Sequence, residues 1–435
     1  MAENSIPSSP FPRVVIVGGG FGGIEFAKTL KNKEVQILML DRHNYHTFQP
    51  LLYQVATGGL EADSIAFPLR KIFKGFKNFT FRVTEVEGVD PDRKVLQTNI
   101  GDINYDYLVI ATGSDTNFFG QKEIEHYSMS MKTIPEALNL RSMILQNMEE
   151  ALIERDVDSK DSLMNFVVVG GGPTGVELSG ALAELKMHIL PKDYPELDIK
   201  QMDIYLIESS PEVLGGMSPQ ASAKAKQFLE EMGVNVINGM RVEGYDGRSV
   251  RLSNGQSIFS KNVLWSAGVK GCVIDGIPAE DLARGNRIKV DEYNQVLGLK
   301  QVFALGDVAA MFTDDYPNGH PGVAPVAIQQ GKTLAKNLLK MLRNEKPEPF
   351  KYNDQGSMAT VGRNKAVVDM GKIRFQGVFA WFVWMFVHLM SLVGFRNKVV
   401  TFVNWVWSYF SYDRGTRLII RRFSRESMTE DTAAK

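Results

Sequence analysis

Val14-Val15-Ile16-Val17-Gly18-Gly19-Gly20-Phe21-Gly22-Gly23 is the stretch that decides the fold. Its four apolar residues, mostly β-branched, predict a buried parallel strand. The glycines at 18, 20 and 23 fit the pattern G-x-G-x-x-G. In that pattern the glycines allow a tight turn, a close approach of backbone to a pyrophosphate, and close packing of the next helix, expected from Ile24. The N–H groups at the start of such a helix point at phosphates. The stretch therefore predicts a dinucleotide-binding unit.

The next predicted strand, Val35–Leu40, ends on Asp41, which lies 23 positions after Gly18. A carboxylate at this place can accept hydrogen bonds from an adenosine ribose. A glycine-rich turn without a ligand is the alternative interpretation of this segment.

The same arrangement occurs a second time. Strand Phe166–Val169 runs into Gly170, Gly172 and Gly175, and a helix is expected from Val176. The following strand, Ile204–Ile207, ends on Glu208, 38 positions after Gly170. This gap exceeds the usual spacing of about 20, and we expect residues 191–203 to form an inserted loop. Two complete copies predict two bound dinucleotides.

Composition excludes several classes of function. The 435 residues suffice for two or three domains, and a net charge of −1 gives no overall signal for nucleic acid. The single cysteine, Cys272, rules out disulfides within the chain and C-x-x-C redox pairs, and the six histidines lack ligand spacing, so we expect no metal. Residues 1–12 resemble neither a secretory signal nor a transit peptide and are expected to form a disordered tail.

Three other segments bear on the nucleotide sites. Residues 42–56 contain His43 and His46, which we interpret as part of a loop around a cofactor rather than as catalytic groups. Strand Tyr107–Ile110 continues into Ala111-Thr112-Gly113, and strand Asn262–Trp265 continues to Gly268. A third strand, from Gln301, ends on Gly306-Asp307, where a simple turn or helix cap is the alternative.

Paired G-x-G-x-x-G units, the A-T-G strand end and the A-x-G-D segment resemble the two-dinucleotide flavoprotein reductases. The resemblance implies an α/β fold with two Rossmann-like domains, the NAD domain inserted in the FAD domain. It implies FAD-binding residues Gly18, Gly20, Phe21, Gly22, Gly23, Asp41, Arg42, Thr112, Gly113, Asp307 and Ala324. It implies NADH-binding residues Gly170, Gly172, Pro173, Thr174, Gly175, Glu177, Glu208 and Gly268. The expected domains are 13–118 and 289–345 for FAD, 119–288 for NADH, and 346–435 for a C-terminal membrane-anchoring region.

Two acidic residues of the second unit carry specific expectations. A carboxylate at Glu208 favours a free 2′-hydroxyl and repels a 2′-phosphate, so we predict a preference for NADH over NADPH. The resemblance places a glutamate such as Glu177 near the nicotinamide and flavin, where it could orient or shuttle protons. An acid in the first turn of a helix is also favoured by the helix dipole alone, so a structural role stays open.

The C-terminal region is rich in apolar and aromatic residues. Val378–Phe395 is apolar except for His388, Ser391 and Gly394, and its 18 residues would reach about 27 Å as a helix, which is marginal for a membrane span. In Val399–Tyr412 the polar residues fall on one helical face, namely Thr401, Asn404, Ser408 and Ser411, and the rest, including Trp405, is expected to be apolar surface. Four of the five tryptophans lie between Trp381 and Trp407.

A basic flank accompanies these helices. Seven basic residues stand against the single acid Asp413, and they are Arg396, Lys398, Arg414, Arg417, Arg421, Arg422 and Arg425. We favour a monotopic helical hairpin in one leaflet with the basic flank on lipid headgroups. A core helix pair or dimer interface, and a single transmembrane span, are the alternatives.

With no cysteine pair to receive electrons, the acceptor must meet the flavin directly. Residues 48–56, the segment Ala324-Pro325-Val326-Ala327-Ile328-Gln329-Gln330 and the aromatic C-terminus resemble the type II NADH:quinone oxidoreductases. The resemblance implies quinone-binding residues Ala324, Ala327, Gln329 and Gln330, with Pro325 standing where the family often has glutamine.

It further implies an enzyme of the respiratory chain on the cytoplasmic side of the cell inner membrane. Such an enzyme passes electrons from NADH through FAD to menaquinone or ubiquinone without pumping protons. The exposed aromatic helices of the C-terminus leave a homodimer open. An NADH-dependent reductase of oxygen or of a small electron-carrier protein, and a non-enzymatic NADH-sensing flavoprotein, are the alternatives.

Overall fold

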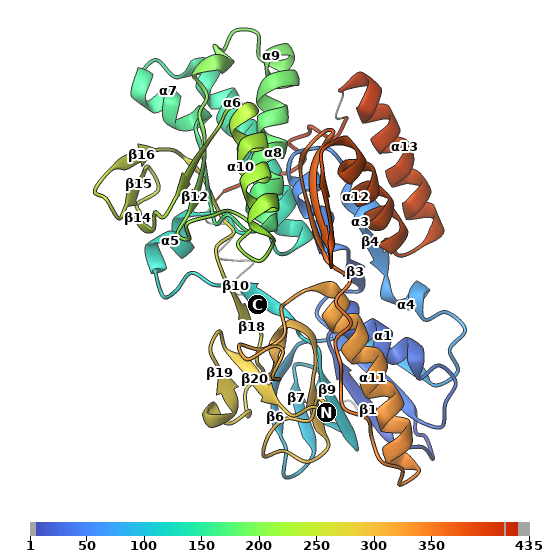
Figure 1. Ribbon diagram of the computed structural model, residues 1–435. Helices are drawn as coiled ribbons and strands as arrows, with labels where there is room; N and C mark the ends of the chain where they lie inside the picture. The colour runs from blue at the N-terminus through green and yellow to red at the C-terminus, as the bar shows by residue number, and fades with distance from the viewer. Residues whose placement is uncertain (1–5, 413–414, 425–435) are drawn as a thin grey trace. The chain divides into compact units, whose positions relative to one another are not determined.

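The computed structural model describes residues 6–412 and 415–424, which divide into two compact units (Figure 1). Unit 1 contains the chain up to His46, Phe67–Asp115 and Val269–Asp354. Unit 2 contains Thr47–Ala66, Thr116–Gly268 and the chain from Gln355. The predicted insertion of one nucleotide domain in the other is therefore present, but its bounds differ from those expected.

Unit 1 is built around strand β1 (Arg13–Val17), which lies at the centre of a parallel sheet ordered β21-β9-β1-β2-β5. Val15 of β1 is opposite Leu38 on one side and Leu108 on the other. These residues are fully buried, as expected for a parallel sheet covered on both faces. The other strands of this sheet are β2 (Gln36–Asp41), β5 (Phe79–Val83), β9 (Tyr107–Ile110) and β21 (Val302–Ala304).

Helices α1 (Phe21–Thr29) and α11 (Ala324–Leu342) lie side by side in unit 1 (Figure 1). They approach so closely that a Cβ on Gly331 would stand 2.4 Å from the carbonyl oxygen of Gly22. Helix α1 begins at Phe21, three residues earlier than expected, so Gly22 and Gly23 form part of its first turn. Glycine suits this turn because α1 packs so closely against the sheet of unit 1 and against α11 that no side chain would fit.

Small sheets, antiparallel except for the β20–β22 pair, complete unit 1. They contain β6 (Val86–Asp90), β7 (Val95–Thr98), β8 (Ile103–Asn104), β19 (Leu282–Ala283), β20 (Arg287–Val290) and β22 (Ala309–Met311). Residues 269–288 belong to unit 1, in which β20 pairs in parallel with β22, whereas they were expected in the second nucleotide domain. The expected disordered tail also needs correction from residue 6 onward, since Ile6 packs against the core and Pro7 accepts a hydrogen bond from Gln36.

Unit 2 repeats the central motif of unit 1. Its parallel sheet has the order β13-β12-β11-β17, with β11 (Phe166–Val169) paired to β12 (Ile204–Glu208) and β17 (Asn262–Trp265). The remaining nucleotide-domain elements are α5 (Lys122–Tyr127), α6 (Ile134–Ile153), α7 (Val157–Met164), α8 (Pro173–His188), α10 (Pro219–Glu231), β13 (Val234–Asn238), β14 (Val242–Tyr245), β15 (Ser249–Leu252) and β16 (Ser257–Phe259).

The segment 191–203 is not the open loop expected from its composition. It contains the end of α9 (Leu190–Asp193) and a short 3-10 helix at Ile199–Gln201. Tyr194 and Leu197 are buried in it. Its apolar side chains therefore pack into unit 2, which explains how a long insertion between the second glycine loop and β12 keeps a fixed course.

The C-terminal part of unit 2 packs against α8. It forms an antiparallel sheet of β23 (Ser357–Gly362), β24 (Lys365–Met370) and β25 (Ile373–Gln376), followed by α12 (Val378–Ser391) and α13 (Phe395–Ser411). Gly180 of α8 lies so close to β23 that an added Cβ would stand 1.5 Å from the carbonyl oxygen of Val361. The C-terminal part is therefore packed into unit 2, which includes the chain from residue 355. The expected boundary, a separate region beginning at residue 346, differs from this.

Candidate functional site

The first glycine loop is shaped to receive a phosphate group. Gly18 has φ +112°, and a Cβ there would stand 2.3 Å from the carbonyl oxygen of Ala111, so only glycine fits. Gly20 caps the N-terminus of α1 and has open space around the position of its absent Cβ. The free N–H groups of the first turn of α1 therefore face room for a ligand.

Asp41 at the end of β2 closes this loop. Its carboxylate accepts hydrogen bonds from the N–H of Gly19 (2.6 Å) and the N–H of His43 (2.7 Å). Beneath the loop, the buried ring of His46 contacts the carbonyl oxygen of Gly19 through Nδ1 at 3.2 Å. Burial lowers the pKa of His46 to about 4, so the ring is neutral at physiological pH. His46 therefore supports the loop, as the sequence interpretation favoured.

The second glycine loop has the same geometry. Gly170 has φ +108°, and Glu208 at the end of β12 accepts hydrogen bonds from the N–H of Gly171 (2.5 Å) and the N–H of Ser210 (2.6 Å). Partial burial alone would raise the pKa of Glu208, but the N–H groups of Ser210 and Gly171 outweigh it and lower the pKa below its ordinary value. Glu208 therefore carries its negative charge at neutral pH.

Helix α8 starts at Pro173, not at Val176, so Pro173, Thr174 and Gly175 form its first turn. A proline at this position costs no hydrogen bond because the first N–H groups of a helix have no partner within it. Gly172 caps the helix and has open space around it. Gly268, the fourth glycine among the predicted NADH-binding residues, has φ +76° and lies against the ring of Phe119.

The other predicted FAD residues of unit 1 lie at strand ends. The hydroxyl of Thr112 donates to the carbonyl oxygen of Cys272 (2.6 Å), and the N–H of Cys272 donates to the carbonyl oxygen of Gly113 (3.1 Å). Asp307 accepts a hydrogen bond from the hydroxyl of Ser114 (2.8 Å). Sequence reasoning missed Ser114, although it directly follows the A-T-G strand end. Arg42 is half-exposed and stands 3.9 Å from Glu85.

The residues predicted to line a quinone site sit on the first turns of α11. The side chain of Gln330 is buried, and its Oε1 accepts a hydrogen bond from the N–H of Gly306 (2.8 Å). Gln329 exchanges two hydrogen bonds with the backbone of Asn353, both 2.9 Å long. Ala327 is buried against Gly306, and Ala324 is the first residue of the helix. Both amides thus have protein partners in unit 1.

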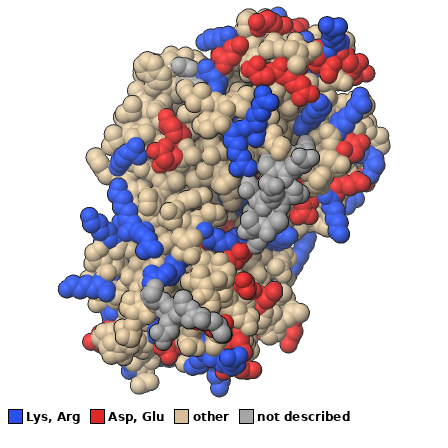
Figure 2. Space-filling view, turned by 180° about the vertical axis from the view of Figure 1, so that it is seen from behind, with Lys and Arg blue, Asp and Glu red and all other residues tan. Residues whose placement is uncertain are grey.

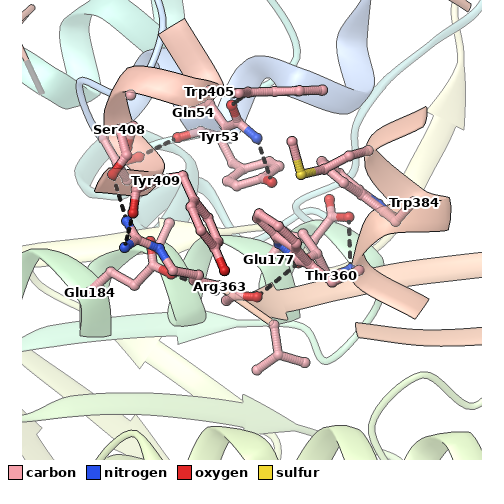
Figure 3. Close-up of a pocket in the computed structure, with 17 residues that line it drawn as sticks. Tyr53, Gln54, Glu177, Glu184, Thr360, Arg363, Trp384, Trp405, Ser408 and Tyr409 are labelled. Carbon is pink, nitrogen blue, oxygen red and sulfur yellow. Dashed lines mark hydrogen bonds between the residues drawn. The ribbon is translucent and has the colours of Figure 1, made fainter. Parts of the chain in front are cut away.

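Glu177 lies at a cavity of about 90 Å³ in unit 2 (Figure 3). Its side chain is 8 % exposed, and its Oε1 stands 3.4 Å from the N–H of Thr360. Burial raises the pKa of Glu177 to about 8, although the N–H groups of Thr360 and of the Trp384 indole act in the opposite direction. The acid is therefore mainly protonated at pH 7.

Sequence reasoning missed most of the residues that line this cavity. They come from α2 (Leu52–Ala56), the segment after it, α8, β23, α12 and α13. They include Tyr53, Gln54, Thr57, Ala181, Glu184, Arg363, Trp384, Trp405, Ser408 and Tyr409. Two signals were available, namely the clustering of tryptophans, which was assigned to membrane surface, and residues 48–56, which were used only for the cofactor loop and the family resemblance.

The C-terminal helices turn their polar face inward. Asn397 donates to the carbonyl oxygens of Asp63 (3.1 Å) and Ala66 (2.8 Å), and Asn404 donates to Glu61 (2.6 Å). Thr401 is fully buried. Trp405 belongs to this inner face as well, since it is 8 % exposed and donates to Oε1 of Gln54 (2.8 Å), so its predicted place on the apolar surface was wrong.

Large apolar side chains cover the outer face of α12 and α13. Trp407 is 65 % exposed and Phe410 is 80 % exposed. Further exposed apolar residues of the two helices are Val378, Phe379, Phe382, Phe386, Val387, Met390, Phe395, Val399, Phe402, Val403 and Val406. Figure 2 shows mostly uncharged surface at the upper left of the view, on the side that carries these helices, with Lys and Arg side chains below it. Among the residues that the structure describes, no helix has both the length and the apolar character needed to cross a membrane.

The basic flank is only partly available to a ligand. Arg417 forms an ion pair with Asp193 at 2.6 Å, and Lys398 donates to the carbonyl oxygen of Met390 (2.6 Å). Arg396, Arg421 and Arg422 are exposed, with Arg396 standing 3.6 Å from Asp63. The predicted positions Asp413, Arg414 and Arg425 lie outside the described residues.

Comparison with known proteins identifies the family. Residues 12–331 match the pyridine nucleotide-disulphide oxidoreductases, and residues 355–411 match the NDH2 C-terminal domain. The type II NADH:quinone oxidoreductase Ndh of Mycobacterium tuberculosis is 36 % identical over 95 % of this chain and 92 % of its own length. The chain belongs to the type II NADH:quinone oxidoreductases.

More distant relatives extend the comparison. The type II NADH:quinone oxidoreductase of Haemophilus influenzae is 29 % identical over 87 % of this chain and 92 % of its own length. The structure of NDH2 from Plasmodium falciparum in complex with NADH shares the fold, with a TM-score of 0.85, 20 % identity and coverage of 94 % of this chain and 100 % of that one. The sulfide:quinone oxidoreductase of Aquifex aeolicus also shares the fold, with a TM-score of 0.72, 22 % identity and coverage of 92 % and 95 %.

Membership of the type II NADH:quinone oxidoreductases confirms the resemblance, the α/β fold and the FAD cofactor predicted from the sequence. The residues of the first glycine loop fit FAD, because Gly20 leaves open space above the first turn of α1 and Asp41 closes the loop beside it. The assignment of individual residues to FAD, NADH and quinone stays a prediction.

Proposed function

We propose that this protein is a membrane-associated enzyme that oxidises NADH and reduces a membrane quinone through FAD. The observation that carries the proposal is the orientation of the C-terminal helices of unit 2. Their polar faces pack inward beside α8, the helix that follows the second glycine loop, while the apolar side chains of Trp407 and Phe410 face outward. A unit that combines a dinucleotide loop with an apolar outer surface suits an enzyme whose second substrate is dissolved in lipid.

FAD is proposed to bind unit 1 with its pyrophosphate at the start of α1. The N–H groups around Gly20 would hold the phosphates, and Asp41 has lone pairs left for a ribose hydroxyl. Asp307 and Gly113, both at strand ends of unit 1, are the proposed partners of the rest of the cofactor. Bound FAD supplies the hydride acceptor and the two-electron donor of the reaction.

NADH is proposed to bind unit 2 with its pyrophosphate at the start of α8 and its adenosine ribose at Glu208. The charged carboxylate of Glu208 supports a preference for NADH, because a 2′-phosphate would meet a second negative charge at that position. No arginine follows Glu208, since the next residues are Ser209 and Ser210.

The overall reaction consumes one proton, because NADH, quinone and H⁺ give NAD⁺ and quinol. Glu177 is the proposed source of this proton, since its raised pKa keeps it protonated at pH 7 and its burial keeps bulk water away. The acid must then regain a proton before the next turnover. In this role Glu177 is a catalytic acid and not simply a favourable residue near a helix N-terminus.

The predicted quinone residues Ala324, Ala327, Gln329 and Gln330 are proposed to shape one wall of the quinone site. Because both glutamine amides already bond to protein backbone, their role would be to hold the start of α11 rather than to donate to the quinone. Pro325 in the first turn supports this, since it fixes the helix start without using a hydrogen bond.

The protein is proposed to attach to the cytoplasmic side of the cell inner membrane as a monotopic protein. The apolar faces of α12 and α13 would enter the headgroup region, and exposed basic side chains such as Arg421 and Arg422 would meet anionic lipid. A second copy of the chain is the other candidate to cover this face, as a homodimer.

One anaerobic experiment tests the proposed function. Purified holoprotein is mixed with NADH, which should bleach the yellow absorbance of the flavin, and a soluble quinone analogue is then added. Return of the yellow colour at a rate matching steady-state turnover supports the proposal. Fast return with oxygen and slow return with quinone would instead identify an oxygen reductase.

A further inference from the structure

The cavity beside Glu177 connects two acidic side chains of one helix. Glu177 and Glu184 are seven residues apart on α8, and both line the cavity (Figure 3). Seven residues make about two turns, so the two side chains point the same way about 10.5 Å apart along the helix. Ala181, which also lines the cavity, lies between them.

The inner end of the cavity holds polar groups that need a partner. Trp384 is 2 % exposed, and its indole N–H faces the carboxyl of Glu177, whose pKa it helps to lower, without meeting any described acceptor at ordinary hydrogen-bond distance. The Oε1 of Glu177 lies 3.4 Å from the N–H of Thr360. A water or a ligand oxygen in the cavity would satisfy the indole donor more closely.

The outer end of the cavity is polar and only partly buried. Glu184 Oε1 accepts a hydrogen bond from the backbone N–H of Arg363 (2.6 Å). The guanidinium group of Arg363 points away, to the carbonyl oxygens of Ser408 (2.7 Å) and Tyr409 (2.8 Å) at the end of α13. It thereby caps that helix with a positive charge and fixes the β23–β24 turn against Glu184.

Few ionisable groups face this space. Arg363 comes from the turn after β23, Tyr409 from α13 and Tyr53 from α2, and the two glutamates come from α8. The rest of the described lining is neutral. Because a water needs about 10–15 Å³ of such volume, a cavity of about 90 Å³ has room for several waters in a row.

We propose that this cavity is a proton-uptake path, in which waters carry protons from the partly exposed Glu184 to the buried Glu177. The inference rests on the proposed function, because it supplies the one proton that quinol formation consumes. When Glu177 has given its proton to the quinone, its carboxylate takes a proton from the adjacent water. That water is reprotonated through Glu184, which takes its own proton from solvent. Glu184 acts through Glu177 and does not touch the quinone.

The test compares three variants of the full-length holoprotein. Glu184→Gln keeps an oxygen to accept the Arg363 N–H but cannot carry a proton. Ala181→Val narrows the cavity between the two glutamates without changing any charge. Glu231→Gln is the matched control, because Glu231 also binds the C-terminal sheet, through Lys365, but does not line the cavity.

Stopped-flow reduction of the flavin by NADH should be unchanged in all three variants. With a quinone analogue, kcat of Glu184→Gln and of Ala181→Val should fall roughly tenfold, which is less than the roughly 10²–10⁴-fold that direct proton transfer by a side chain contributes, because Glu184 acts through Glu177. The loss should deepen as pH rises, the solvent deuterium isotope effect on kcat should increase, and KM for quinone should stay within twofold. Formate should restore part of the activity of Glu184→Gln, and Glu184→Asp should retain most of it.

The proposal is overturned if Glu184→Gln and Ala181→Val both match Glu231→Gln in kcat and pH profile. It is also overturned if KM for quinone rises while the pH profile and isotope effect stay as in wild type, since the cavity would then bind the quinone itself. Failure of the proposed function is seen separately, because wild-type flavin reduced by NADH would then not be reoxidised by quinone.

Discussion

Replacing Glu177 by glutamine tests the electrostatic account of the site most directly. The buried carboxyl has a pKa of about 8, against 4.5 for the ordinary group. Below pH 4.5 it is protonated in both the folded and the unfolded chain, so its ionisation does not change the free energy of unfolding. Between pH 4.5 and about 8 the unfolded chain ionises while the folded one does not. Stability present at acid pH is therefore lost as the pH rises through about 8, above which the cost is constant.

The size of this effect follows from the linkage relation. The cost grows by about 1.4 kcal/mol per pH unit inside the window, so it grows by about 2.7 kcal/mol between pH 5.5 and pH 7.5. Glutamine keeps an oxygen for the Thr360 N–H but does not ionise. The variant should therefore gain stability relative to wild type as the pH rises, with a difference in Tm that widens by roughly 3–5 °C across these two pH units.

Thermal unfolding of the two holoproteins, followed by circular dichroism at each pH, measures this difference. Glu231→Gln serves as control, because the pKa of Glu231 is lowered by its hydrogen bond to Lys365, so this group is ionised throughout the window and its difference should not widen. A constant difference between wild type and Glu177→Gln from pH 5.5 to 7.5 would refute the buried neutral acid. If Glu177→Gln instead loses stability and keeps full quinone turnover, the role of Glu177 is structural.

Three further predictions concern other parts of the chain. Glu208→Ala should raise the ratio of NADPH to NADH kcat/KM about tenfold, equivalent to about 1.4 kcal/mol, because it removes the charge that repels a 2′-phosphate; steady-state kinetics with both nucleotides checks this, and an unchanged ratio would contradict it. Trp407→Glu and Phe410→Glu should each lower the affinity for anionic vesicles, measured by co-sedimentation, by tenfold or more, because burying one such side chain contributes about 1.5–3 kcal/mol. The kcat with a soluble quinone should stay unchanged. A changed oligomeric state with unchanged vesicle binding would instead identify a dimer surface. Gly180→Ala should lower the Tm, because its Cβ would stand 1.5 Å from the carbonyl oxygen of Val361 and the overpacking costs about 1–3 kcal/mol; an unchanged melting curve would show that β23 shifts freely.

Point substitutions on the outer face of α12 and α13 test membrane attachment more specifically than removal of residues 377–435 would. Trp384 and Trp405 belong to the inner face of the C-terminal helices and line the cavity beside Glu177. Deleting them would open the interior of unit 2 as well as remove the apolar surface. Release of such a truncated protein from membranes would therefore not distinguish lost anchoring from lost folding.

The sequence by itself determined the two nucleotide units, because local chemistry dictates them. A β-branched run followed by Gly18, Gly20 and Gly23 can turn tightly only where no Cβ intervenes, and the structure has this turn at both predicted places. Strand limits were predicted within about one residue for the same reason. The expected helix starts were late because the first turn of a nucleotide-binding helix includes the glycines themselves.

Only the tertiary structure decided which side of each C-terminal helix faces inward and what surrounds Glu177. Helical periodicity separates a polar from an apolar stripe, but the buried Trp405 depends on Gln54, 351 positions earlier in the chain. The cavity likewise joins α2, α8, β23, α12 and α13, so no local pattern could predict it. The pKa of Glu177 follows from that burial and not from its neighbours in sequence, because desolvation depends on every segment that excludes water.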